Sequence, residues 1–189
     1  MIWLFALLMA APAPRWQHDW NAAFRMAKEQ HRLVLVHYTQ TEARCKPCWQ
    51  FKQTLDQPDV QQRMSDFVLL RLDPEISAIP LAHRYSTPAA VVFDAGERER
   101  FRIEGFHAVK ADDWHRTWGN IWDYPFFGPL EEIRKAAPKF VEASELFDQK
   151  KDLEAYQLLA ATYEQLQMPA HARAAKEAAD KLVKSFSSP

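Results

Sequence analysis

The chain of 189 residues has two cysteines, Cys45 and Cys48, and their type and spacing could do redox chemistry. A cysteine thiolate attacks disulfides, so one of the two sulfurs can capture a partner as a mixed disulfide. A cysteine three residues further along a helix lies one turn away, close enough to close a disulfide and release that partner. The pair therefore indicates thiol–disulfide exchange.

The flanking residues predict that Cys45 is the activated thiol. Residues 32–38 form a β-branched apolar run typical of a buried strand, and residues 49–55 continue with helical spacing. Cys45 should then stand at a helix N-terminus, where unpaired N–H groups and the helix dipole favour a thiolate. Lys46 adds a neighbouring cation, and Pro47 suits the first turn, where a missing N–H costs little.

Other uses of the two cysteines were weighed against this one. A structural zinc site usually needs four Cys or His ligands, and the sequence has no second cysteine pair. A purely structural disulfide normally closes a longer loop. A copper site made of both sulfurs and a histidine is a further alternative, although the seven histidines show no clustered ligand spacing. We therefore expect no metal site and no cofactor.

Composition and the N-terminus restrict the partners and the compartment. The formal net charge of -1 and the lack of a basic stripe argue against nucleic acid as a partner. Residues 1–14 form an apolar leader that is too short to span a bilayer as a helix and looks like a signal peptide, with small residues at Ala11 and Ala13. We expect export to the periplasm or secretion, into an oxidising compartment.

The chain in order alternates strands and helices, which predicts an α/β domain with a mixed sheet. Strands are expected at residues 33–38, 67–72, 89–93 and 98–104, and helices at 19–28, 49–64 with a break at Pro58, 76–85 and 111–121. Residues 124–129 are the predicted linker to a helical tail. Its three amphipathic stretches are expected at 130–147, 153–166 and 170–186.

Thr87-Pro88 directly precedes the third predicted strand. One interpretation is an ordinary turn, because proline is tolerated at the start of a strand. The functional interpretation is a cis-proline whose preceding backbone lies beside the cysteines and pairs with a substrate backbone.

Taken together, these features resemble the thioredoxin fold. The resemblance spans about residues 16–121 and is nearest to the C-terminal domain of the bacterial transmembrane thiol:disulfide interchange protein and its periplasmic relatives. It implies an α/β thioredoxin-like domain over residues 15–123, with a central mixed sheet flanked by helices. The C-terminal α-helical extension over residues 130–189 lies beyond the resemblance, and its last two stretches are weakly tetratricopeptide-like. The segments that carry the resemblance are residues 33–38, 45–48, 58–61, 67–70 and 88–105.

The resemblance also implies roles for individual residues. Cys45 would be the nucleophile, Cys48 would resolve the mixed disulfide, and Thr87-Pro88 would dock the substrate. The expected function is then a thiol:disulfide oxidoreductase whose partners are protein thiols and disulfides, with a membrane protein as electron donor. The alternative is a redox-inert or metal-binding scaffold that holds a partner through its helical tail.

The sequence departs from the family pattern near the cysteines. Arg44 stands where members usually have Trp before the first cysteine, and Val36 aligns with the buried Asp of thioredoxins. The proton acceptor for Cys48 is therefore open, with His37 and Glu42 as the alternatives by nearness in sequence.

Overall fold

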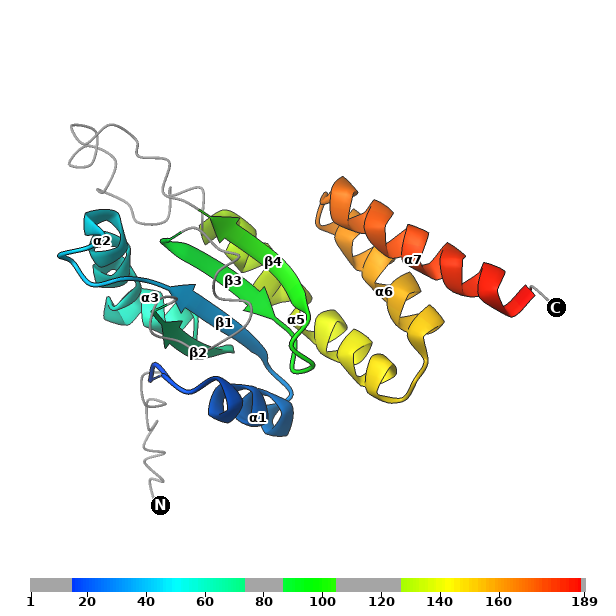
Figure 1. Ribbon diagram of the computed structural model, residues 1–189, viewed down its shortest axis with the longest axis horizontal. Coiled ribbons are helices and arrows are strands. Elements are labelled where there is room, and N and C mark those ends of the chain that lie inside the picture. Colours follow the sequence, from blue (N-terminus) through cyan, green and yellow to red (C-terminus); the bar gives the residue numbers. More distant parts are fainter. Residues whose placement is uncertain (1–14, 74–86, 105–126, 188–189) are drawn as a thin grey trace, which may run out of the picture.

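The computed structural model describes residues 15–73, 87–104 and 127–187 (Figure 1). The predicted leader at residues 1–14 and the predicted helices at 76–85 and 111–121 lie outside these ranges. Within the described ranges, no helix is long and apolar enough to cross a membrane.

Four strands form one mixed sheet in the order β2-β1-β3-β4. Their bounds are β1 Leu33–Tyr38, β2 Phe67–Leu72, β3 Ala89–Phe93 and β4 Glu99–Glu104. β1 runs parallel to β2 and antiparallel to β3, and β4 runs antiparallel to β3. The register places Tyr38 opposite Ala89, so the carboxyl end of β1 and the start of β3 lie at the same end of the sheet. The predicted mixed sheet is confirmed.

Helices cover both faces of the sheet because alternate side chains of β1 point to opposite sides. Val34, Val36 and Tyr38 pack with α1 (Trp20–Gln30). Leu33 and Leu35 point the other way, into a core shared with α2 (Lys46–Leu55) and α3 (Pro58–Arg63). The predicted break at Pro58 is the boundary between these two helices.

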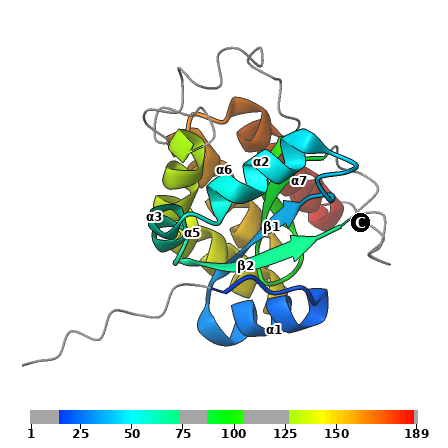
Figure 2. The same ribbon diagram turned by 90° about the vertical axis from the view of Figure 1, so that its left-hand side faces the viewer.

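The C-terminal extension consists of α5 (Phe127–Asp148), α6 (Asp152–Gln165) and α7 (Pro169–Ser187). Figure 1 shows α5 running along the sheet toward α6 and α7, which lie side by side. The first turn of α5 overlaps the predicted linker: residues 127–129 are helical, and residues 124–126 lie outside the described ranges. Figure 2 shows α5 and α3 on one side of the sheet and α1 below it.

The extension shares its hydrophobic core with the sheet. Ile133 and Phe140 of α5 and Leu159 of α6 belong to the same buried cluster as Leu33 and Leu35 of β1. Such a continuous core makes the extension part of the same folding unit as the sheet.

Polar contacts reinforce this packing at the β3–β4 hairpin. The Tyr163 hydroxyl of α6 donates to the carbonyl of Arg100 at 3.0 Å, and the Arg98 guanidinium lies 4.4 Å from the ring of Phe147. Asp94, fully buried at the hairpin turn, pairs with the Arg100 guanidinium. The buried charge of Asp94 is therefore neutralised where α5 and α6 dock.

This shared core predicts the effect of truncating Phe140, which is fully buried and stacks at 5.4 Å on Tyr163. Phe140→Ala should lower the free energy of unfolding by about 3–5 kcal/mol. In urea titrations, the circular dichroism of the helices and the fluorescence of the tryptophans should shift together, because both report one cooperative unit. Val183→Ala, at a half-exposed position of α7, is the control and should change stability by less than about 1 kcal/mol. Two separate unfolding transitions would contradict a shared core.

Candidate active site

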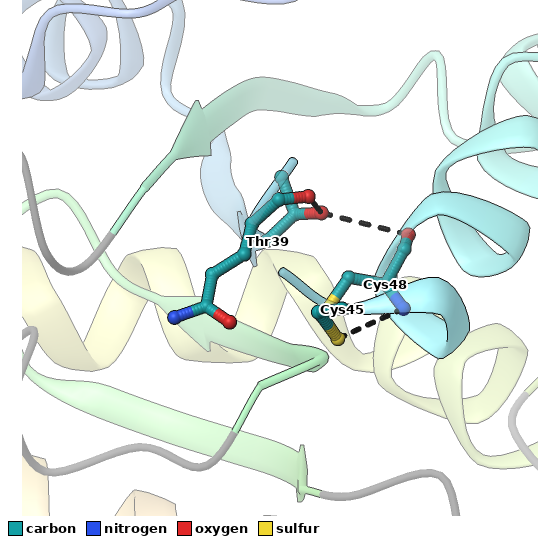
Figure 3. Close-up of a disulfide and its surroundings, with 4 residues drawn as sticks. Thr39, Cys45 and Cys48 are labelled. Atoms are coloured by element: carbon teal, nitrogen blue, oxygen red, sulfur yellow. Dashed lines mark hydrogen bonds between the residues drawn. A yellow bond between two sulfur atoms is a disulfide. The ribbon is translucent and has the colours of Figure 1, made fainter. Parts of the chain in front are cut away.

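The two cysteines lie at the start of α2 and are joined as a disulfide, with a Cα–Cα distance of 5.2 Å (Figure 3). Cys45 is the N-cap residue, and its Sγ accepts a hydrogen bond from the Cys48 N–H at 3.2 Å. Lys46 and Pro47 form the first turn of the helix. The predicted position of Cys45 at a helix N-terminus is confirmed.

The two sulfurs differ in access. Cys48 is fully buried, whereas Cys45 is partly exposed, and Lys46 and Pro47 next to it are exposed. A partner can therefore approach the Cys45 sulfur from solvent, while Cys48 is shielded beneath the helix. This arrangement fits an attacking and a resolving cysteine in that order.

Thr39 joins the end of β1 to the cysteine helix. Its N–H donates to the Leu72 carbonyl at 2.9 Å, which continues the pairing of β1 with β2. Its hydroxyl lies 3.5 Å from the Cys48 carbonyl oxygen, at the limit of a hydrogen bond (Figure 3). The cysteine pair is thereby held at the carboxyl end of β1.

Thr87-Pro88 lies at the same end of the sheet. The peptide bond between them is cis, as predicted, and Pro88 is buried while Thr87 is partly exposed. The next residue, Ala89, faces Tyr38 across the β1–β3 ladder, immediately before Thr39. Thr87-Pro88 therefore lies at the end of the sheet where α2 begins. Its role in substrate docking stays a prediction.

His37 and Glu42, the two alternatives for a proton acceptor, have different surroundings. Glu42 is exposed in the loop before α2. His37 is fully buried in β1, its ring packs edge-on against Phe51 of α2 at 5.1 Å, and its Nδ1 accepts from Arg71 Nε at 3.2 Å. Burial and then the charge of Arg71 hold the pKa of His37 well below its usual value, so this imidazole is neutral at neutral pH.

A polar network that the sequence analysis missed surrounds His37. The Arg71 side chain is 10% exposed and donates to Asp56 Oδ1 at 2.7 Å, while Lys52 Nζ lies 2.6 Å from Asp56 Oδ2. The Arg71 guanidinium also lies 4.0 Å from the ring of Trp16. The sequence feature that could have predicted this network is Arg71 itself, because a charged side chain within an apolar strand needs a charge or hydrogen-bond partner.

The charge of Asp56 depends on this network. Burial opposes ionisation of the carboxyl group, but the hydrogen bonds and charges of Arg71 and Lys52 outweigh it and hold the pKa of Asp56 below its usual value. Asp56 is also the C-terminal capping residue of α2, so the ion pair fixes that end of the helix to β2.

Across residues 15–73, 87–104 and 127–187, no group of three His, Cys, Asp or Glu side chains is placed to hold a metal ion.

The lowered pKa of His37 predicts how stability depends on pH. The folded state keeps His37 neutral, whereas the unfolded chain binds a proton below about pH 6.5, so acid favours unfolding. The free energy of unfolding should fall below pH 6.5 by up to about 1.4 kcal/mol per pH unit from this group. Asp56, with a lowered pKa, contributes stability that is lost only at more acidic pH.

Urea titrations between pH 7.5 and 5 measure this slope. His37→Phe should flatten it relative to the natural chain, because the residue that gains a proton on unfolding is gone. An equal slope in both proteins would contradict the assignment. Leu35→Ala, at a buried position on the same face of β1, is the control: it removes no titrating group, so it should lower stability about equally at every pH and leave the slope unchanged.

Comparisons with known proteins find similarity over part of the chain. A family model described as thioredoxin-like matches residues 15–95. Among solved structures, the chain is similar to the solution structure of a thioredoxin from Thermus thermophilus, with 24% sequence identity and a TM-score of 0.42 over 49% of this chain and 76% of that one. No curated protein matches the chain significantly.

The matched segment runs from the residues before α1 to the end of β3 and includes both cysteines. A cysteine pair at disulfide distance in such a domain supports thiol:disulfide oxidoreductase activity in general terms. The thioredoxin-like fold predicted from the sequence is confirmed: the family model matches residues 15–95, and the described part of the chain beyond them adds strand β4 and a C-terminal helical extension.

Proposed function

We propose that the chain is a thiol:disulfide oxidoreductase that exchanges disulfides with protein partners, Cys45 attacking and Cys48 resolving. The observation that carries the proposal is the unequal exposure of the two sulfurs at the N-terminus of α2. Of the two, Cys45 is partly exposed to solvent and Cys48 is fully buried, which supports Cys45 as the attacking residue.

The reductive reaction proceeds in two exchanges. The Cys45 thiolate attacks a sulfur of the partner disulfide, forms a mixed disulfide and displaces the other partner sulfur as a thiolate. The Cys48 thiolate then attacks Cys45 Sγ, closes the Cys45–Cys48 disulfide and releases the second partner thiolate. Two electrons pass from the cysteine pair to the partner, whose thiolates take up protons from water.

Local groups at the helix start favour this chemistry. The Cys48 N–H already donates to Cys45 Sγ at 3.2 Å, and a thiolate at that position accepts the same hydrogen bond more strongly. The exposed ammonium of Lys46 lies on the neighbouring residue and adds positive charge. Both effects stabilise the attacking and leaving form of Cys45.

We propose that partners dock at the end of the sheet where the cysteines lie. Thr87 and Pro88 precede β3 at the same end of the sheet as Thr39 and the start of α2. A partner segment bound in an extended conformation along this loop would bring its own disulfide toward Cys45.

The predicted leader is the basis of our proposal for the compartment and the electron supply. Export by residues 1–14 would place the protein in an oxidising compartment, where a disulfide persists unless a dedicated donor reduces it. A membrane-bound dithiol protein is the proposed donor, in line with the family resemblance. Reductant or oxidant behaviour then depends on the reduction potential of the pair relative to its partners.

Mixed-disulfide trapping tests the roles of the two cysteines. Cys48→Ser should accumulate covalent complexes with a model disulfide protein, because the resolving sulfur is missing, whereas Cys45→Ser should accumulate none. Non-reducing gels and mass spectrometry identify the complexes, with the double variant as the control. Equal trapping by both single variants would overturn the assignment, and absence of exchange by the natural chain would favour the redox-inert scaffold.

Alkylation of the reduced protein tests the activation of Cys45. Iodoacetamide at about pH 6 should label Cys45 at least about tenfold faster than Cys48, because Cys45 is more exposed and stands at the helix N-terminus. Peptide mass spectrometry after short labelling times measures the ratio. The same labelling in urea is the control, where the two rates should converge. Faster labelling of Cys48 in the folded protein would contradict the proposal.

A further inference from the structure

The tautomer of His37 is determined by its hydrogen bond to Arg71. A guanidinium has only donors, so the 3.2 Å contact from Arg71 Nε makes His37 Nδ1 the acceptor. The neutral imidazole must then carry its proton on Nε2. This nitrogen is buried and has no hydrogen-bond partner among the described residues. His37 thus presents a buried N–H donor in need of an acceptor, which is the opposite of a proton acceptor.

The groups around His37 preserve this state. Arg71 lies on β2, while Lys52 and Asp56 lie at the C-terminal end of α2, and all three contribute to the electrostatic field at the imidazole. Burial and Arg71 dominate, so the pKa of His37 is well below its usual value and the ring stays neutral. Trp16, whose ring lies 5.9 Å from that of His37, has a second buried N–H that meets no acceptor within the described part of the chain.

The position of His37 relates it to the resolving cysteine. His37 and Thr39 are two residues apart at the end of β1, so their side chains point to the same face of the sheet. On that face, Thr39 reaches the Cys48 carbonyl and His37 contacts Phe51, one helical turn after Cys48. His37 therefore lies on the face of the sheet that α2 covers, next to the turn of the helix that follows Cys48, which is itself fully buried.

We propose that His37 is a positioning residue that donates its Nε2–H toward the sulfur of Cys48 once the disulfide is reduced, and that it is not the proton acceptor. The inference rests on the proposed oxidoreductase function. It assigns His37 a fixed task in resolution: to stabilise the anionic sulfur that attacks Cys45.

The attack of Cys48 on the mixed disulfide needs no protein base at the position of His37. In the mixed disulfide, the Cys48 thiol loses its proton to water, and the resulting thiolate receives the hydrogen bond from His37. The thiolate forms the bond to Cys45 Sγ, while the bond from Cys45 to the partner sulfur breaks and the partner thiolate leaves. The Nε2 proton stays on His37 throughout, because Nδ1 is occupied by Arg71.

Two measurements test the proposal on the full chain. Long-range ¹H–¹⁵N spectra of the natural protein should show His37 protonated on Nε2 and unprotonated on Nδ1 from pH 8 to 5. In the Cys45→Ala background, ¹³C labelling of the Cys48 Cβ gives the pKa of this single thiol. His37→Phe should raise that pKa by about one unit or more, because a donor to the charged form is lost.

Matched variants separate this role from packing. His37→Gln keeps an amide N–H donor and should restore at least about half of the shift. Leu35→Ala removes a buried side chain from the same strand and face without touching a donor, and it should destabilise the fold while leaving the Cys48 pKa unchanged. A proton on Nδ1, an unchanged pKa in His37→Phe, or an equal shift in Leu35→Ala would each overturn the proposal.

Exchange assays on the natural chain distinguish this inference from the function on which it rests. Absence of exchange together with the expected Cys48 shift would reject the oxidoreductase function and retain the donor role of His37. Normal exchange without the shift in the Cys48 pKa would retain the oxidoreductase function and reject the donor role of His37. If His37→Phe fails to fold, the spectra of the natural chain and the His37→Gln titration still decide the outcome.

Discussion

β1 is the constraint on which the structure depends, because it pairs with strands on both sides and is buried on both faces. Its pleat sends Leu33 and Leu35 into the core shared with α2 and the extension, and Val34 and Val36 into the core shared with α1. The end of the strand leads through Thr39 to the cysteine helix. A shift of β1 by one residue would exchange these two faces and displace the site.

His37 and Arg71 lie near the ends of the buried strands β1 and β2, so their polar groups need hydrogen-bond or charge partners within the protein. Arg71 meets its charge partner in Asp56 and a neutral acceptor in His37, and the aromatic face of Trp16 covers it. These contacts tie β2, β1 and the C-terminal end of α2 together, while Thr39 holds the other end of that helix. The cysteine helix thus contacts the sheet near both of its ends.

The helical extension belongs to the same body as the sheet. Phe140 and Tyr163 continue the core that begins at Leu33, and the buried pair of Asp94 and Arg100 lies where α6 contacts β4. The extension therefore supports the sheet from the side of α5. The cysteines lie where β1 ends and α2 begins.

The sequence by itself determined the strand order along the chain, the position of Cys45 at a helix start, the division of the helix at Pro58 and the helical tail. These features are local, since hydrophobic period, capping and proline geometry act within a few residues. Only the tertiary structure decided that His37 is a donor and that Arg71, Asp56 and Trp16 surround it. Their separations in sequence are long, and burial against residues from other elements sets both the protonation state and the hydrogen-bond partner of a side chain.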